Sequence, residues 1–189
     1  MISCIVLAGG KSSRMGTDKS ALIFEGKTLL ERTVSRFETV FDTVLVSVRK
    51  NDRRFTKYKT VEDIYEDCGP LSGLHAALSA RPHGVFITAA DMPFADPYLA
   101  LHILKLGRSW DACIINTSCP HPLFGWYSSA VLSVAEQRLR DGQYSMTDLL
   151  KSVNTRYLSE IELPQFNIGR CLLNINTPDE FIKLKNIHD

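Results

Sequence analysis

Residues 7–19 read LAGGKSSRMGTDK and directly follow the apolar run Ile2 to Leu7. A run that is apolar or small at every position is typical of a strand buried on both faces of a sheet. Gly9 and Gly10 then let the backbone turn sharply and point its N–H groups toward a ligand. Three cations follow within nine residues: Lys11, Arg14 and Lys19. A solvated basic loop would share this composition, but the position after the first strand favours a polyphosphate-binding loop.

Strand-like and helix-like segments alternate along the rest of the chain. The expected strands cover residues 43–48, 60–61, 84–89, 111–116, 123–127 and 172–175, and helices are expected from residues 29, 70, 97, 129, 145 and 177. Such alternation predicts a three-layer α/β/α, Rossmann-like fold with a mostly parallel, mixed sheet. We find no linker, low-complexity stretch or internal repeat, so residues 1–189 are expected to form a single domain.

The composition excludes several classes of protein. The 22 basic and 21 acidic residues leave a net charge of +1, which predicts no nucleic-acid or membrane partner. The five cysteines contain no C-x-x-C pair, so neither a disulfide framework nor a thiolate zinc site is expected. We therefore expect a cytoplasmic protein. The dinucleotide pattern G-x-G-x-x-G is absent, which disfavours an NAD-dependent oxidoreductase.

Two glycine–lysine pairs resemble the end of a P-loop but lack its first glycine. The pattern G-x-x-x-x-G-K-[ST] needs a glycine five residues before Gly10 or Gly26, and these positions hold Ile5 and Ala21. The loop after the first strand is therefore a different kind of phosphate-binding loop.

Ligands of open α/β sheets bind beyond the carboxyl ends of the strands. This rule selects the loop after Leu7, the segment near Asp63, Asp91 and the loop that ends at His121-Pro122. Asp91 follows a buried strand pattern, where a carboxylate is well placed to hold Mg²⁺ together with phosphate oxygens and water. An aspartate before a proline turn is the simpler explanation, but the basic loop upstream favours the metal.

The stretch LAGGKSSRMGTDK resembles the signature loop of the molybdenum cofactor guanylyltransferases (MobA family), which have the sugar-nucleotidyltransferase-like fold. That signature is roughly L-A-G-G-x-S-x-R-M-G-x-D-K, and every fixed position matches. Further matches follow in order and span nearly the whole chain: Glu62-Asp63, Gly69-Pro70-Leu71-Ser72-Gly73, Asp91-Met92-Pro93, His121-Pro122 and Asn174-Ile175-Asn176-Thr177-Pro178.

The resemblance implies a role for each matching residue. A nucleotide-binding set would hold GTP, with Asp63 near the nucleoside: Leu7, Ala8, Gly9, Gly10, Lys19, Asp63 and Asp91. The catalytic set would be Arg14, Lys19 and Asp91, with Asp91 also binding Mg²⁺ as the metal cofactor. Residues facing the pterin acceptor would be His121, Pro122, Asn174 and Asn176. The family often has Asn near position 47, where this chain has Ser47, so we assign that position no role.

These roles imply a Mg²⁺-dependent guanylyltransferase that moves GMP from GTP onto molybdopterin, with or without molybdenum, and releases pyrophosphate. The resemblance leaves open which cofactor delivery proteins or apo-molybdoenzyme chaperones the protein meets. Alternatives are a related enzyme that uses CTP or another phosphorylated acceptor, including a sugar phosphate, and a non-catalytic nucleotide-binding protein. Gly10 and the Met15-Gly16 pair favour guanine, because the related cytidylyltransferases tend to replace the second glycine by alanine.

Overall fold

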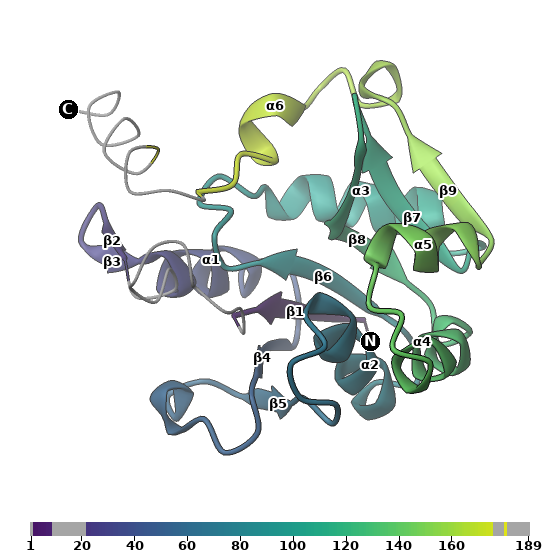
Figure 1. Ribbon diagram of the computed structural model, residues 1–189. Helices are drawn as coiled ribbons and strands as arrows, with labels where there is room; N and C mark the ends of the chain where they lie inside the picture. The colour runs from purple at the N-terminus through teal and green to yellow at the C-terminus, as the bar shows by residue number, and fades with distance from the viewer. Residues whose placement is uncertain (1, 9–21, 176–179, 181–189) are drawn as a thin grey trace.

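The computed structural model describes residues 2–8, 22–175 and 180, and its ribbon is shown in Figure 1. Five residues with predicted roles lie outside the described residues: Gly9, Gly10, Arg14, Lys19 and Asn176. The helix predicted from residue 177 lies there too, apart from Glu180, which is helical. Among the helices described, none is long and apolar enough to cross a membrane.

A mixed sheet of seven strands forms the centre of the molecule, in the order β5-β4-β1-β6-β8-β7-β9. The strands are β1 (Ser3–Leu7), β4 (Val44–Val48), β5 (Thr60–Glu62), β6 (Val85–Ala89), β7 (Ala112–Asn116), β8 (Pro120–Tyr127) and β9 (Thr155–Leu158). Strand β8 runs antiparallel to both of its neighbours, and every other neighbouring pair is parallel. The predicted mostly parallel, mixed sheet is therefore confirmed.

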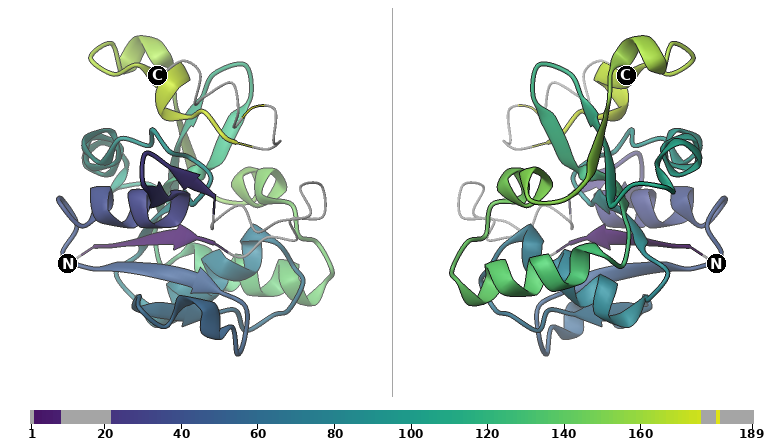
Figure 2. Two further views of the ribbon diagram at one scale, coloured as in Figure 1. Left: turned by 90° about the vertical axis from the view of Figure 1, so that its left-hand side faces the viewer. Right: turned by 90° about the vertical axis from the view of Figure 1, so that its right-hand side faces the viewer.

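Helices cover both faces of this sheet, as Figure 2 shows. One face packs on α1 (Leu29–Phe37), α3 (Pro97–Gly107) and the short α6 (Ile168–Cys171). The other face packs on α2 (Pro70–Ala80), α4 (Val131–Arg140) and α5 (Met146–Lys151). The central strands β1, β4 and β6 are buried along almost their whole length, because helices cover them on both sides. The three-layer α/β/α prediction is confirmed.

Local sequence signals explain where the two helices nearest the site begin. Thr28 caps α1 in a capping box, in which its hydroxyl accepts from the Glu31 N–H at 3.1 Å and the Glu31 carboxylate accepts from the Thr28 N–H at 2.8 Å. Asp96 caps α3 by accepting from the Tyr98 N–H at 2.8 Å, and Pro97 occupies the first helical position. A small hairpin of β2 (Ile23–Phe24) and β3 (Lys27–Thr28) precedes α1.

Two sequence predictions about secondary structure are wrong. The strand expected at residues 172–175 is absent: α6 ends at Cys171, and Ile175 is buried against Phe24, Leu29 and Phe94 instead of pairing with a strand. His121-Pro122 does not end a loop, because β8 already begins at Pro120, which pairs with Asn116. A short run of buried aliphatic residues, such as that at residues 172–175, is compatible with a strand and also with a loop that packs into the core. The sequence pattern therefore did not distinguish these two structures.

Besides the β2–β3 hairpin and α6, three further described elements were not predicted. Strand β9 pairs in parallel with β7 at the edge of the sheet. Two single-turn 3₁₀ helices, η2 (Arg53–Phe55) and η3 (Glu160–Glu162), lie in the connections. The aromatic residues of β8 belong to the core, since Phe124, Trp126 and Tyr127 are all buried.

Candidate active site

The carboxyl ends of β5, β4, β1 and β6 meet at one edge of the sheet. Just beyond the strand pairings, the Ala90 N–H donates to the Leu7 carbonyl at 3.1 Å, and the Ala8 N–H donates to the Ser47 carbonyl at 3.2 Å. The Asp63 N–H donates to the Val48 carbonyl at 2.9 Å. The segments that contain Leu7, Ala8, Asp63 and Asp91 therefore leave the sheet side by side, as the parallel fold predicted.

Asp63 is held by a side chain from the neighbouring strand. The Ser47 hydroxyl, at the end of β4, donates to Asp63 Oδ1 at 3.0 Å. Ser47 itself is buried, with 3% of its surface exposed. The donor is therefore a buried hydroxyl, and its hydrogen bond orients the Asp63 carboxylate.

Helix α2 closes over the same side chains. A Cβ at Gly73 would lie 2.6 Å from Ser47 Oγ and 2.9 Å from Leu7 Cδ2, so only glycine allows the helix to approach this closely. The helix starts after Gly69, whose φ of 67° lies in the left-handed region, and Pro70 takes its first position. Two glycines of the Gly69-Pro70-Leu71-Ser72-Gly73 motif thus bring α2 against the site.

Burial raises the pKa of Asp63 to about 6, although the hydrogen bond from Ser47 and the nearby charge of Arg49 act in the opposite direction. The carboxyl is partly withdrawn from water, which disfavours its charged form. A carboxyl group with a strongly raised pKa at the edge of an α/β sheet is a frequent feature of functional sites.

Asp91 lies in the turn that connects β6 to α3, and its side chain is partly exposed. The turn is defined by its backbone: the Met92 N–H donates to the Ala89 carbonyl at 3.3 Å, and the Ala95 N–H donates to the Met92 carbonyl at 3.1 Å. Among the residues described, no group of three or more His, Cys, Asp or Glu side chains comes together. Asp91 is therefore not part of a preformed cluster of such side chains within the described part of the chain.

Two arginines of α1 hold the turn that contains Asp91. Arg32 Nε donates to the Pro93 carbonyl at 3.3 Å, and Arg36 Nη1 donates to the same oxygen at 3.1 Å. Sequence reasoning missed this contact. The only signal was the spacing of two arginines four residues apart on one face of a helix, which is usually a solvated face.

The segment with Asn174 is joined to the same turn. The Ile175 N–H donates to the Asp91 carbonyl at 2.9 Å, so Asn174 lies close to the candidate metal ligand although 83 residues separate them in the sequence. Asn174 Oδ1 is buried and has no hydrogen-bond partner among the described residues. A buried polar atom without a partner is unusual, and ligand sites are one of the places where it occurs.

His121 and Pro122 lie near the start of β8. This strand is antiparallel, so its first residues point to the edge where the parallel strands end. His121 Nε2 and the Thr117 hydroxyl lie 2.8 Å apart, and burial lowers the pKa of His121 from its usual value. The hydroxyl of buried Tyr127 donates to the Pro122 carbonyl at 2.7 Å, which fixes the backbone beside His121.

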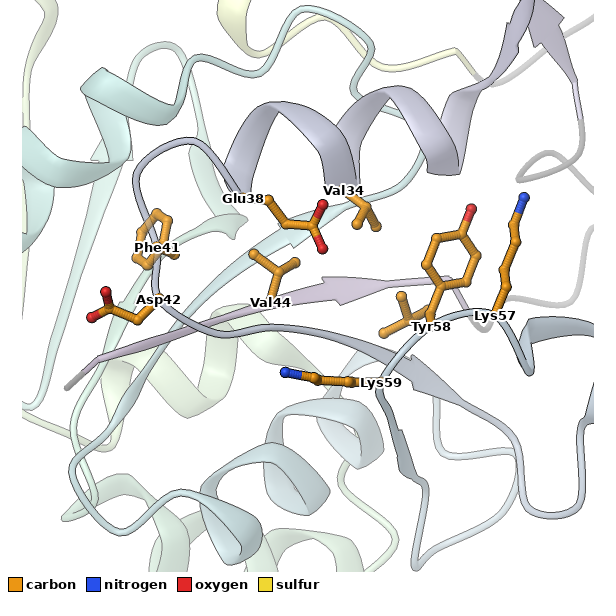
Figure 3. A pocket seen from close by; sticks show the side chains of 9 residues that line it. Val34, Glu38, Phe41, Asp42, Val44, Lys57, Tyr58 and Lys59 are labelled. Atoms are coloured by element: carbon orange, nitrogen blue, oxygen red, sulfur yellow. The ribbon is translucent and has the colours of Figure 1, made fainter.

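The structure thus brings Leu7, Ala8, Asp63, Asp91 and Asn174 to adjoining segments and places His121-Pro122 at the same edge of the sheet. A cavity of about 310 Å³ elsewhere, between α1, the first half of β4 and the residues that precede β5, contains none of these residues (Figure 3). Its acidic side chains, Glu38 and Asp42, are balanced by Lys57 and Lys59. We assign this cavity no role in the site.

Comparison with known proteins narrows the class. Residues 4–157 match the family described as MobA-like NTP transferase domain. A "Probable molybdenum cofactor guanylyltransferase" from Peptoclostridium acidaminophilum is 33% identical, over 94% of this chain and 86% of the relative. A "Molybdenum cofactor guanylyltransferase" from Campylobacter jejuni subsp. doylei is 29% identical, over 98% and 96% of the two chains.

A solved structure supports the same assignment. The molybdopterin-guanine dinucleotide biosynthesis protein A from Archaeoglobus fulgidus superposes with a TM-score of 0.89 at 25% identity, over 99% of this chain and 98% of that chain. Fold, strand-end site and relatives define this protein as a nucleotidyltransferase. More specifically, the chain belongs to the family of MobA-like NTP transferase domains.

Proposed function

We propose that the protein transfers GMP from GTP to molybdopterin, which yields molybdopterin guanine dinucleotide and pyrophosphate. The proposal is supported by relatives that bear the guanylyltransferase name and align along nearly the whole chain. The observation that supports it within the molecule is that the segments of Asp63 and Asp91 leave the same edge of the sheet, on either side of β1, the strand that precedes Gly9 and Gly10 in the sequence.

The reaction needs positioning and charge neutralisation rather than a covalent nucleophile of the protein. The terminal phosphate of molybdopterin is largely dianionic near neutral pH, and it attacks the α-phosphorus of GTP in line as pyrophosphate leaves. Arg14 and Lys19 offset the charge that grows on the leaving pyrophosphate. Asp63, oriented by Ser47, accepts hydrogen bonds from the nucleoside and holds GTP for the attack.

Asp91 is the residue that would hold Mg²⁺. This ion commonly takes one or two protein carboxylates and completes its shell with phosphate oxygens and water, so a single partly exposed carboxylate fits it. When bound, Mg²⁺ neutralises charge on the phosphates. The two arginines on the Pro93 carbonyl keep the turn, and with it Asp91, in place.

The acceptor would lie on the side of the Asp91 turn that faces away from Asp63 and the nucleotide. Asn174, whose buried Oδ1 has no partner among the described residues, would accept a hydrogen bond from the pterin. His121-Pro122 and Asn176 would complete this side.

The cysteines described are all free, which agrees with a protein that works in the reducing cytoplasm.

The test is the release of pyrophosphate by the purified protein with molybdopterin and Mg²⁺, with GTP and CTP compared at equal concentration. We expect release with GTP and little with CTP. Asp91→Asn should reduce turnover with GTP by roughly 100-fold or more, because metal-ion stabilisation is worth several kcal/mol. Turnover that stays close to wild type would show that Asp91 is not the metal ligand.

Asp42→Asn is the matched control. Asp42 is exposed and precedes β4, so it lies at the opposite edge of the sheet, and its replacement removes the same charge. This variant should keep the wild-type rate. Equal turnover with GTP and CTP would refute the guanylyltransferase assignment and favour a broader nucleotidyltransferase.

A further inference from the structure

A second cavity, of about 270 Å³, opens between α1, the start of α3 and α6. Figure 1 shows that these three elements adjoin the connection from β6 to α3, which contains the Asp91 turn. The cavity shares no residue with the predicted nucleotide or acceptor sets. Its walls combine guanidinium groups, aromatic rings and amides, and its lining consists of Arg32, Arg36, Phe94, Asp96, Gln165, Phe166, Asn167, Arg170 and Cys171.

The charges in this cavity do not cancel. Three guanidinium groups face one carboxylate, that of Asp96, whereas the cavity in Figure 3 has acids and lysines in equal number. Arg32 forms an ion pair with Glu25, outside the cavity. Arg36 and Arg170 form no ion pair with any described residue, so the cavity retains a positive charge.

The two unpaired guanidinium groups are held in place by other contacts. Arg170 lies over the Phe94 ring, with 4.6 Å between its Cζ and the ring centroid. Arg36 uses Nη1 to hold the Pro93 carbonyl, and its remaining N–H groups donate to no described residue. Burial, and then repulsion by Arg32, lower the pKa of Arg36, although the nearby charge of Asp96 acts in the opposite direction.

We propose that this cavity binds a phosphate-type oxyanion, at a site separate from the nucleotide site. The planar fork of a guanidinium group matches the oxygens of phosphate, and two fixed arginines around one pocket give such an anion several charge-assisted hydrogen bonds. The volume of about 270 Å³ lies just below the range of about 300–1,000 Å³ that is usual for ligand pockets, so it favours a small ligand. It suits inorganic phosphate or a small phosphate monoester, and Phe166 offers a surface for an attached ring.

The site has a direct link to the Asp91 turn. Arg32 and Arg36 line the cavity and also donate to the Pro93 carbonyl, two residues after Asp91. An anion bound by Arg36 therefore contacts the group that holds this turn. Binding in the cavity and the position of the turn are coupled through one side chain.

Titration with inorganic phosphate, followed by NMR of the arginine Nε–H groups in ¹⁵N-labelled protein at constant ionic strength, tests the proposal. We expect saturable shifts of the Arg36 and Arg170 signals. An effect transmitted from the nucleotide site through the Pro93 carbonyl would persist in Arg170→Gln, so loss of the Arg36 shift in that variant marks binding in the cavity. Arg170→Gln and Arg36→Gln should each weaken the binding seen at the other arginine at least tenfold, with circular dichroism confirming that both variants fold.

Arg108→Gln is the matched control, since Arg108 is exposed at the end of α3 and lies outside the cavity. It should bind phosphate as the wild type does. Shifts that rise linearly without saturation, or equal affinity in wild type and both cavity variants, would overturn the proposal and leave the arginines with a purely structural role.

Phenyl phosphate, titrated in the same way, distinguishes two sources of the anion. Binding at least fivefold tighter than that of inorganic phosphate would assign the site to a phosphate monoester that carries a ring. Equal affinity for the two ligands would assign it to free phosphate.

Discussion

Replacement of Asp63 by Asn should stabilise the folded protein while it weakens GTP binding. Burial raises the pKa of this carboxyl from 3.8 to about 6, so folding disfavours its ionised form near neutral pH. The amide of Asn has the same shape, carries no charge and can still accept the hydrogen bond that Ser47 donates. Asp63→Asn therefore removes the cost of the buried charge and keeps the local packing.

The size of the effect follows from the pKa. At 1.36 kcal/mol per pKa unit, a rise from 3.8 to about 6 corresponds to at most about 3 kcal/mol. Asp63 is partly exposed, and screening by water reduces this to roughly 1 kcal/mol. Loss of hydrogen bonds to a charged acceptor costs about 1.5–3 kcal/mol, so GTP affinity should fall roughly 10- to 100-fold.

The pKa shift also predicts how the stability difference between Asp63→Asn and the wild type changes with pH. Between pH 3.8 and about 6 the folded wild type binds more protons than the unfolded chain, so its stability falls as the pH rises through this window. Asp63→Asn lacks this decrease. Urea unfolding at several pH values should show equal stability of the two proteins below pH 3.8 and a gain for the variant that is complete above pH 6.

Asp42→Asn is again the control, because Asp42 is exposed and makes no hydrogen bond with a described side chain. It should show no such gain. A stability difference between Asp63→Asn and wild type that does not change with pH would refute the argument, since it could not come from ionisation. Unchanged GTP affinity would remove Asp63 from the nucleotide site.

Three further changes test the contacts around the site. Gly73→Ala should cost about 1–3 kcal/mol in urea unfolding, because its Cβ would lie 2.6 Å from Ser47 Oγ, and Ser47→Ala in the same protein should recover part of the loss. Ser47→Ala alone should raise the KM for GTP roughly fivefold with kcat nearly unchanged, since Asp63 loses a hydrogen bond worth about 1 kcal/mol. Because that hydrogen bond lowers the pKa of Asp63, the lower-pH limit of GTP binding should also move upward, which a purely structural role of Ser47 would not cause. Tyr127→Phe leaves the Pro122 carbonyl without its donor and should cost about 1–2 kcal/mol of stability, measured by urea unfolding, and raise the KM for the acceptor.

Two control variants accompany these changes. Gly169→Ala, on α6, should leave stability close to wild type, because nothing lies within 4 Å of the added Cβ. Tyr98→Phe removes the hydroxyl of an exposed tyrosine and should affect neither stability nor the acceptor KM. Losses in these controls equal to those of Gly73→Ala and Tyr127→Phe would show that the assigned contacts are not the cause.

Much of the architecture could be predicted because it depends on local patterns. The apolar runs at β1, β4 and β6 and the proline-led starts of α2 and α3 predicted elements that the structure contains. The resemblance of residues 7–19 and of the later motifs to the MobA family is confirmed by the family match over residues 4–157. The roles of Gly9, Gly10, Arg14, Lys19 and Asn176 stay predictions, because these residues lie outside the described part of the chain.

The errors occurred where local pattern does not decide the outcome. Leu172 to Ile175 has the composition of a strand, yet Ile175 is buried against Phe24, Leu29 and Phe94 from distant parts of the chain. Strand β9 has four residues, of which only Leu158 is buried, so it lacks the long apolar pattern of a central strand and forms by pairing with the edge of β7. In both cases tertiary context overrides the intrinsic preference.

By itself, the sequence determined the alternation of strands and helices, the family and the residue types available for chemistry, since side-chain periodicity and capping act over a few neighbouring residues. Only the tertiary structure decided that Ser47 orients Asp63, that Ile175 joins Asn174 to the Asp91 turn, and that the arginines of α1 meet at Pro93. The contacts of Ser47 and of the two arginines join residues 16 to 61 positions apart in the sequence, and the contact between Ile175 and Asp91 spans a longer separation. They depend on the order of strands in the sheet and on which helix covers which face, and no local pattern encodes either.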